Sequence, residues 1–150
     1  MAKEIERKFL VVSDLYKSLA RSIVYIEQGY LSLRKEATVR VRLKGDRAYL
    51  TVKGVSQGAT RDEWEYKIPV DDAHAMLKNC SEGNVISKHR YEVMFEGHLW
   101  EVDEFHGTHE GLVVAEIELG AEDETFPLPP FIGDEVTGNP AYFNSSLAGI

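Results

Sequence analysis

The segment Glu4-Ile5-Glu6-Arg7-Lys8, close to the start of the chain, places Glu4, Glu6 and Lys8 two residues apart. In a β-strand, residues i and i+2 point to the same face of the sheet, so these three charges share one face. Like charges side by side on a strand repel each other unless a partner offsets them. The segment therefore predicts a strand with one face that holds charged material, and with Arg7 on the opposite face.

The same spacing of like charges recurs in later segments, at Arg40 and Arg42, Glu63 and Glu65, Lys88 and Arg90, Glu101 and Asp103, and Glu116 and Glu118. The residues between the paired charges are mostly apolar, with His89 as an exception that should point outward. A polar face in water usually mixes both signs of charge, whereas here each of these pairs carries one sign. The alternation leaves two interpretations open: a sandwich with its polar face in water, or a barrel with its charged faces inward.

Segments of alternating polarity and of β-forming residues cover most of the chain. They predict strands over residues 3–12, 23–33, 38–44, 47–53, 61–69, 85–95, 98–105 and 112–119. Helices are predicted over residues 13–20, 70–80 and 142–148, with Gly83-Asn84 ending the second segment. The fold class is therefore mainly β with a few helices, in an antiparallel barrel or sandwich of about eight strands.

Length and composition narrow the possible classes of protein. The chain has 150 residues, which predicts a single domain over residues 1–150. The formal net charge of −8 argues against broad nucleic-acid binding, which needs a positive field. Neither a targeting segment nor an apolar run long enough to span a membrane is evident. With one cysteine, Cys80, an internal disulfide is impossible, and a cytoplasmic protein is expected.

The charged faces suggest a chemistry if they point inward. Carboxylate oxygens are preferred ligands of Mg²⁺ and Mn²⁺, and the candidates are Glu4, Glu6, Glu116 and Glu118. Lysine and arginine side chains bind phosphate oxygens, and the residues that could surround a linear polyphosphate are Lys8, Arg40, Arg42, Lys53, Lys88 and Arg90. Without a ligand such a site would contain strained, buried charge. The pattern thus favours a tunnel that holds a metal ion and a polyanion.

These segments, in this order, resemble the CYTH superfamily, also called triphosphate tunnel metalloenzymes. Its E-x-E-x-K signature is present as Glu4-Ile5-Glu6-Arg7-Lys8. The further matches are VRVRL at 39–43, LTVKG at 50–54, RDEWEYKI at 61–68, KHRY at 88–91, EVDEF at 101–105 and AEIEL at 115–119. The tail EVTGNPAYFNSSLA also resembles small bacterial members, although Phe131 and Ala141 stand where a tryptophan and a basic residue are common.

The resemblance implies an eight-stranded antiparallel barrel whose charged tunnel binds triphosphate and Mg²⁺ or Mn²⁺, with helices outside and at the C-terminus. It also implies site roles. The metal ligands would be Glu4, Glu6, Glu116, Glu118 and Asp103. Glu63 and Glu65 would support them or hold a second metal ion. The phosphate-binding residues would be Lys8, Arg40, Arg42, Lys53, Lys88 and Arg90, and the residues expected to carry catalysis are Lys8, Glu4, Glu6, Arg42 and Lys88.

The small bacterial members that the chain most resembles are inorganic triphosphatases. The expected activity is metal-dependent hydrolysis of inorganic triphosphate to diphosphate and phosphate. One alternative is a class IV adenylate cyclase or a nucleoside or thiamine triphosphatase. A non-catalytic module that binds polyphosphate or a nucleotide is the alternative from another class. The expected partner is a small triphosphate, with neither nucleic acid nor membrane, and a homodimer is possible.

Overall fold

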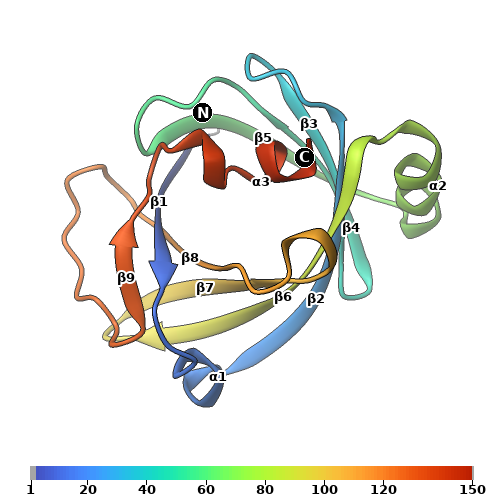
Figure 1. Ribbon diagram of the computed structural model, residues 1–150. Coiled ribbons are helices and arrows are strands. Elements are labelled where there is room, and N and C mark those ends of the chain that lie inside the picture. Colours follow the sequence, from blue (N-terminus) through green and yellow to red (C-terminus); the bar gives the residue numbers. More distant parts are fainter. Residues whose placement is uncertain (1–2, 150) are drawn as a thin grey trace.

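The computed structural model describes residues 3–149, and nine strands dominate this part of the chain. They are β1 (Lys3–Val11), β2 (Ser22–Ser32), β3 (Thr38–Lys44), β4 (Arg47–Lys53), β5 (Thr60–Ile68), β6 (Glu82–Phe95), β7 (His98–Phe105), β8 (Val113–Glu118) and β9 (Ile132–Glu135). The strands follow the order β5-β4-β3-β2-β6-β7-β8-β1-β9, and an additional β5–β1 pairing closes β1 to β8 into an antiparallel barrel. Figure 1 shows this ring of strands in a view into its interior.

Strand β1 is the seam of the barrel. One of its edges pairs with β8, opposing Glu6 to Glu118 and Lys8 to Glu116. Its other edge is shared, because β5 pairs with the beginning of β1 and β9 pairs with its end. The short β9 therefore covers the backbone groups of β1 that β5 does not reach, which satisfies an edge that would otherwise be open.

Around much of the barrel the apolar side chains of the strands face outward and are covered from outside. Around β1, β7 and β8 they form a buried cluster with Phe9, Trp100 and Ile117, packed against Tyr16 and Phe131. Tyr16 belongs to the short helix α1 (Tyr16–Leu19), and Phe131 comes from the segment that follows β8. A hydrophobic layer outside the barrel thus leaves the inward faces of the strands free for charged residues.

On another side, the helix α2 (Val70–Cys80) covers the strands β3 and β4. Its buried residues Ala73 and Leu77 pack against Val41, Leu43 and Ala48. Figure 1 shows α2 outside the ring, on the side of β4. Together with α1, this helix gives the apolar face of the sheet a dry partner.

The C-terminal helix α3 (Asn144–Ala148) lies differently, because it enters one end of the barrel (Figure 1). Its residues Leu147 and Ala148 are buried against Tyr30, Ile86 and Phe105. Gly83 in β6 has a φ of +71° and touches the carbonyl oxygen of Ala148 so closely that a Cβ would clash. A glycine at this position therefore allows the helix to pack against the strand.

The predicted eight-stranded barrel and most predicted strands are confirmed, with differences at the ends of elements. Gly83-Asn84 does not end a segment, because β6 already begins at Glu82. The helix predicted over residues 13–20 is one turn, Tyr16–Leu19. The helix predicted from residue 142 begins at Asn144, after a 3-10 turn over Pro140–Tyr142. Strand β9 was not predicted, because it is short and owes its structure to pairing with β1.

Within residues 3–149, none of the helices has both the length and the apolar character that crossing a bilayer requires.

Candidate active site

The interior of the barrel contains a cavity of about 240 Å³ whose wall is charged. The expected site residues that line it are Glu4, Glu6, Lys8, Arg40, Arg42, Lys53, Glu63, Glu65, Arg90, Glu116 and Glu118. The strand phase predicted from the alternation is therefore correct for these residues. Lys88 and Asp103 do not border the cavity; both are fully buried in the wall behind it.

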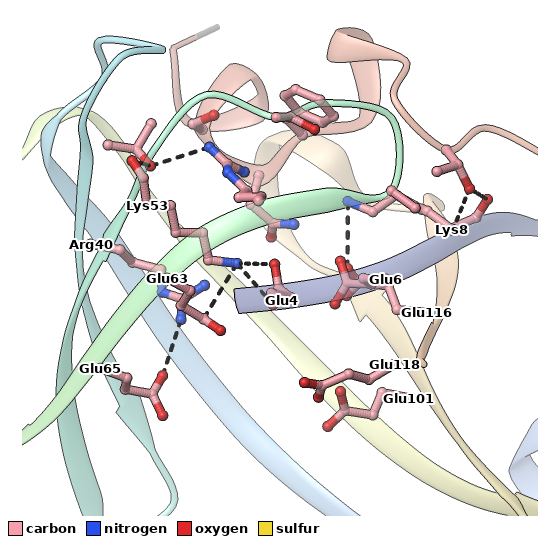
Figure 2. Close-up of a pocket in the computed structure, with 18 of the residues that line it drawn as sticks. Glu4, Glu6, Lys8, Arg40, Lys53, Glu63, Glu65, Glu101, Glu116 and Glu118 are labelled. Carbon is pink, nitrogen blue, oxygen red and sulfur yellow. Dashed lines mark hydrogen bonds and ion pairs between the residues drawn. The ribbon is translucent and has the colours of Figure 1, made fainter. Parts of the chain in front are cut away.

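Carboxylates gather on one side of the cavity. Figure 2 shows Glu6 and Glu116 next to each other, with Glu118 and Glu101 below them. Burial and the neighbouring Glu116, which accepts a hydrogen bond from the Glu6 carboxyl, raise the pKa of Glu6 well above its ordinary value. Burial and the charges of Glu4, Glu63 and Glu101 also raise the pKa of Glu118. These shifts indicate a cluster with more negative charge than the protein itself neutralises.

Two lysines hold this acidic cluster in place. Lys8 Nζ lies 3.6 Å from Glu116 Oε2, and Lys53 Nζ lies 2.9 Å from Glu4 Oε1 and 3.6 Å from Glu63 Oε1. Burial alone would raise the pKa of Glu116, but Lys8 and a hydrogen bond from Glu6 outweigh it and hold that pKa well below its usual range. Although burial works against it, the charge of Glu116 also raises the pKa of Lys8, so Lys8 acts as a fixed cation.

The opposite side of the cavity carries arginines with too few anionic partners. Arg42 is hydrogen-bonded through Nε to Gln28, and burial together with the charges of Arg40 and Arg90 lowers the pKa of Arg42 to about 9. The nearest carboxylate oxygen to Arg40, in Glu65, is 3.6 Å away. Arg40 Nε is buried and has no hydrogen-bond partner among the described residues. An unpaired buried donor beside crowded cations indicates a site for an anion.

Arg90 is held more firmly, by a carboxylate in the wall. It donates two hydrogen bonds to Asp103 and lies 3.5 Å from Glu116 Oε1. Despite its burial, Asp103 keeps a pKa below the ordinary range because Arg90 and Lys88 stabilise its charge. Lys88 Nζ lies 2.7 Å from Asp103, yet burial, with Arg90 and Arg42 nearby, lowers the pKa of Lys88 to about 7. Asp103 therefore orients the cations of this wall.

The C-terminal segment adds residues that the sequence had not indicated. The Lys8 ammonium donates to the backbone oxygen of Tyr142 at 3.0 Å, and the Phe143 ring lies 5.9 Å from Lys8 Nζ and 5.8 Å from the Arg61 guanidinium. Thr137, Phe143, Asn144 and Ser145 of this segment also line the cavity, as does Arg61 of β5. The residues of the tail show no alternation that would predict which side chains point inward, so local patterning carries no signal for them.

Residues predicted to lie out of phase do point away from the cavity. Arg7 pairs with Glu135 on the outside, with Nη2 to Oε1 at 2.6 Å. His89 Nδ1 lies 2.6 Å from His106 Nε2, outside the cavity wall. Both residues thus lie on the opposite face from their neighbouring charge pairs.

Whether the cavity can hold a divalent metal ion depends on the ligand atoms that its side chains offer. Across residues 3–149, no three His, Cys, Asp or Glu side chains converge closely enough to enclose an ion. Glu4 is instead paired with Lys53, and Glu6 with Glu116. Their carboxylate oxygens are nevertheless the ligands that Mg²⁺ and Mn²⁺ prefer. Glu6 and Glu116 lie next to each other and both line the cavity (Figure 2), so the donor set fits such an ion.

A closed antiparallel barrel in which carboxylates face arginines across the lumen is typical of proteins that bind a polyanion inside a β-barrel. The chain belongs to the CYTH family: its residues 2–144 match the CYTH domain. It is 54% identical over 147 residues to an inorganic triphosphatase of Acetivibrio thermocellus, covering 98% of this chain and 94% of that protein. It is 36% identical over 149 residues to an inorganic triphosphatase of Nitrosomonas europaea, covering 97% and 96%.

Solved structures share the fold of this chain. The crystal structure of the inorganic triphosphatase NE1496 is similar with a TM-score of 0.69 and 33% identity, over 100% of this chain and 97% of that chain. The PH1012 protein of Pyrococcus horikoshii has a TM-score of 0.63 at 19% identity, over 80% of each chain, and shares the fold.

Proposed function

We propose that this protein hydrolyses inorganic triphosphate to diphosphate and phosphate inside the barrel, with Mg²⁺ or Mn²⁺ as its cofactor. The observation that carries the proposal is the opposition of charges in one cavity: crowded carboxylates on one side, and arginines with an unpaired buried donor on the other. Relatives named inorganic triphosphatase, at 54% and 36% identity over nearly the whole chain, support the choice of substrate.

The basic residues of the cavity would bind the phosphates. Arg40 and Arg42 have hydrogen-bonding capacity that protein carboxylates do not use, so a triphosphate would supply the missing acceptors. Lys53, Lys8 and Arg90 would complete the contacts from the neighbouring strands. Lys88, buried behind the wall, would act on this side as a charge that supports Arg90 and Asp103.

The acidic side would hold the metal ion through Glu4, Glu6, Glu116 and Glu118. A bound divalent ion supplies neutralisation of phosphate charge and a lower pKa for the attacking water. Asp103, with both oxygens engaged by Arg90 and Lys88, would contribute by holding these cations rather than as a ligand. Glu63 and Glu65 would orient Lys53 and Arg40, their observed neighbours.

In the reaction, water would attack a terminal phosphorus in line with the bridging oxygen, forming the new P–O bond of phosphate as the bond to the diphosphate breaks. One proton of the water would end on the leaving diphosphate. Phosphoryl transfer depends mainly on positioning and charge neutralisation. Arg42 and Arg90 would stabilise the charge that develops on the leaving diphosphate. Lys8, held between Glu116 and the Tyr142 carbonyl, would stabilise the phosphoryl group under attack.

A phosphate-release assay tests the proposal. The purified protein is given tripolyphosphate, ATP and thiamine triphosphate in turn, each with Mg²⁺ and with Mn²⁺, while cyclic AMP is also measured. We expect tripolyphosphate to be the best substrate, with diphosphate and phosphate in equal amounts. Formation of cyclic AMP, or faster hydrolysis of ATP or thiamine triphosphate, would replace the proposal with one of these activities. Absence of any turnover would indicate a binding module.

We also place the protein in the cytoplasm, because its single cysteine, Cys80, is exposed as a free thiol, which suits a reducing compartment.

A further inference from the structure

Asn144, the first residue of α3, lies where the C-terminal helix meets the basic wall of the cavity. Its Oδ1 atom accepts a hydrogen bond from Gln28 Nε2 at 2.9 Å and one from Lys88 Nζ at 2.9 Å. Gln28 in turn accepts from Arg42 Nε at 2.8 Å through its Oε1. One amide from the tail is thus connected to two cations that stand on different strands.

The direction of this chain of hydrogen bonds is determined at both ends. Arginine and lysine can only donate, so Arg42 requires the oxygen of Gln28, and Lys88 requires the oxygen of Asn144. The remaining nitrogen of Gln28 then donates to Asn144. Both lone pairs of Asn144 Oδ1 are consequently used, and its amide orientation follows from chemistry.

The nitrogen of the same amide is left without a protein partner. Among the described residues, no group accepts a hydrogen bond from Asn144 Nδ2. The oxygen points toward Gln28 and Lys88, which are both fully buried in the wall, whereas Asn144 itself borders the cavity. The free N–H groups are therefore on the side where a ligand would lie.

We propose that Asn144 binds the substrate through Nδ2, donating to a non-bridging oxygen of the triphosphate, while its Oδ1 positions Lys88 and, through Gln28, Arg42. The inference rests on the proposed function and adds a residue of the tail to the phosphate site. Because the contact is made by α3, packing of this helix in the barrel and binding of the triphosphate support each other.

Two substitutions distinguish the contact of Asn144 with the substrate from its hydrogen bonds to Lys88 and Gln28. Asn144→Asp keeps an oxygen that accepts from Gln28 and Lys88, removes the donor and adds a negative charge. Asn144→Ala removes both the oxygen and the donor and adds no charge. The matched control is Ser146→Ala, since Ser146 lies on the same helix and does not border the cavity. Steady-state kinetics with tripolyphosphate and melting temperatures with and without tripolyphosphate are measured for all three variants and for the original protein.

Without ligand, we expect Asn144→Asp to melt at or above the melting temperature of the original protein. Its KM should rise at least ~10-fold, because it loses a hydrogen bond to a charged group and its added carboxylate repels the phosphates. Asn144→Ala should raise KM similarly and also lower kcat, because Arg42 and Lys88 lose their support. Ser146→Ala should match the original protein.

If Asn144→Asp keeps the KM of the original protein while Asn144→Ala raises KM and lowers kcat, the contact with the substrate is refuted. Asn144 would then have a purely structural role. An original-like KM for Asn144→Ala would overturn the contact as well, whether or not Asn144→Asp folds, because a higher KM in Asn144→Asp alone would then come from its added charge. If the original protein does not hydrolyse tripolyphosphate, the proposed function fails, and the melting shift decides alone: a shift that Asn144→Asp loses supports the contact, and a shift that it keeps, or none in any variant, refutes it.

Discussion

Arg90 and Asp103 form a paired contact in the wall of the barrel, with Nε to Oδ1 at 2.7 Å and Nη2 to Oδ2 at 2.9 Å. Both side chains are almost completely buried, and Lys88 shares the same carboxylate. Asp103, which does not border the cavity, therefore holds the guanidinium of Arg90, which does. In the sequence the two residues belong to separate charge pairs of opposite sign, and they meet because β6 and β7 place them directly opposite each other.

The first prediction concerns this contact. Replacing Asp103 by Asn would leave the buried Lys88 without its paired carboxylate and Arg90 with only its longer contacts to Glu101 and Glu116. Breaking a buried pair in this way costs about 3–5 kcal/mol. Urea unfolding of Asp103→Asn should show a loss of this size. Glu101→Gln is the matched control, because Glu101 contacts Arg90 only at 3.4 Å and should cost less than about 1 kcal/mol. Equal losses in both variants would contradict the assigned role of Asp103.

The second prediction separates two neighbouring carboxylates. Glu6→Gln and Glu116→Gln should both lower turnover, since each removes a charge from the proposed metal site. Their stabilities should differ: Glu6 is crowded by Glu116 and Glu4, whereas Glu116 is paired with Lys8. Without metal, thermal melts should show Glu6→Gln unchanged or more stable, and Glu116→Gln less stable. The reverse order of melting temperatures would show that the charge balance described here is incorrect.

The third prediction concerns removal of metal. Hydrolysis of tripolyphosphate should stop after exhaustive treatment with EDTA and return on addition of Mg²⁺ or Mn²⁺, because the clustered carboxylates repel a polyanion unless a cation lies between them. Circular dichroism of the EDTA-treated protein provides the control, since the fold should persist. Hydrolysis at the full rate after chelation would argue against a metal at this site.

Fourth, tripolyphosphate should stabilise the fold, because it gives acceptors to arginines that now have too few. At a concentration ~100 times its Kd, a ligand adds about 2.7 kcal/mol to the free energy of unfolding. The measurement uses the Glu6→Gln variant, so that turnover does not consume the ligand. Sulfate, which spans only part of the cavity, should raise the melting temperature much less. An equal rise with both anions would indicate unspecific binding.

The fifth prediction compares an inward arginine with an outward one. Arg42→Ala should reduce kcat/KM at least ~10-fold, equivalent to about 1.4 kcal/mol of lost transition-state binding. Arg7→Ala should leave kcat/KM unchanged, because its guanidinium pairs with Glu135 outside the cavity. His89→Ala, on the outer face of β6, should behave like Arg7→Ala. Comparable losses for Arg7→Ala and Arg42→Ala in folded protein would mean that the strand phase is wrong.

Much of the barrel was determined by the sequence alone, because the period of two in a strand is a local property. Alternation at Glu4, Glu6 and Lys8, or at Arg40 and Arg42, is enough to assign side chains to one face without knowing the partner strand. The hairpin around Gly45-Asp46 follows from local turn chemistry in the same way. For this reason most strands, and most of the charged side chains that these strands present to the cavity, could be predicted.

The tertiary structure decided which face is inside and which residues meet across the lumen. Alternation is identical for a polar face in water and for one around a cavity, and the difference arises only when β5 pairs with β1 and closes the ring. Strand β9 exists because β1 has a free edge, and Asn144 reaches Lys88 because α3 folds back into the barrel. Such contacts join positions far apart in the chain, so local patterns carry no signal for them.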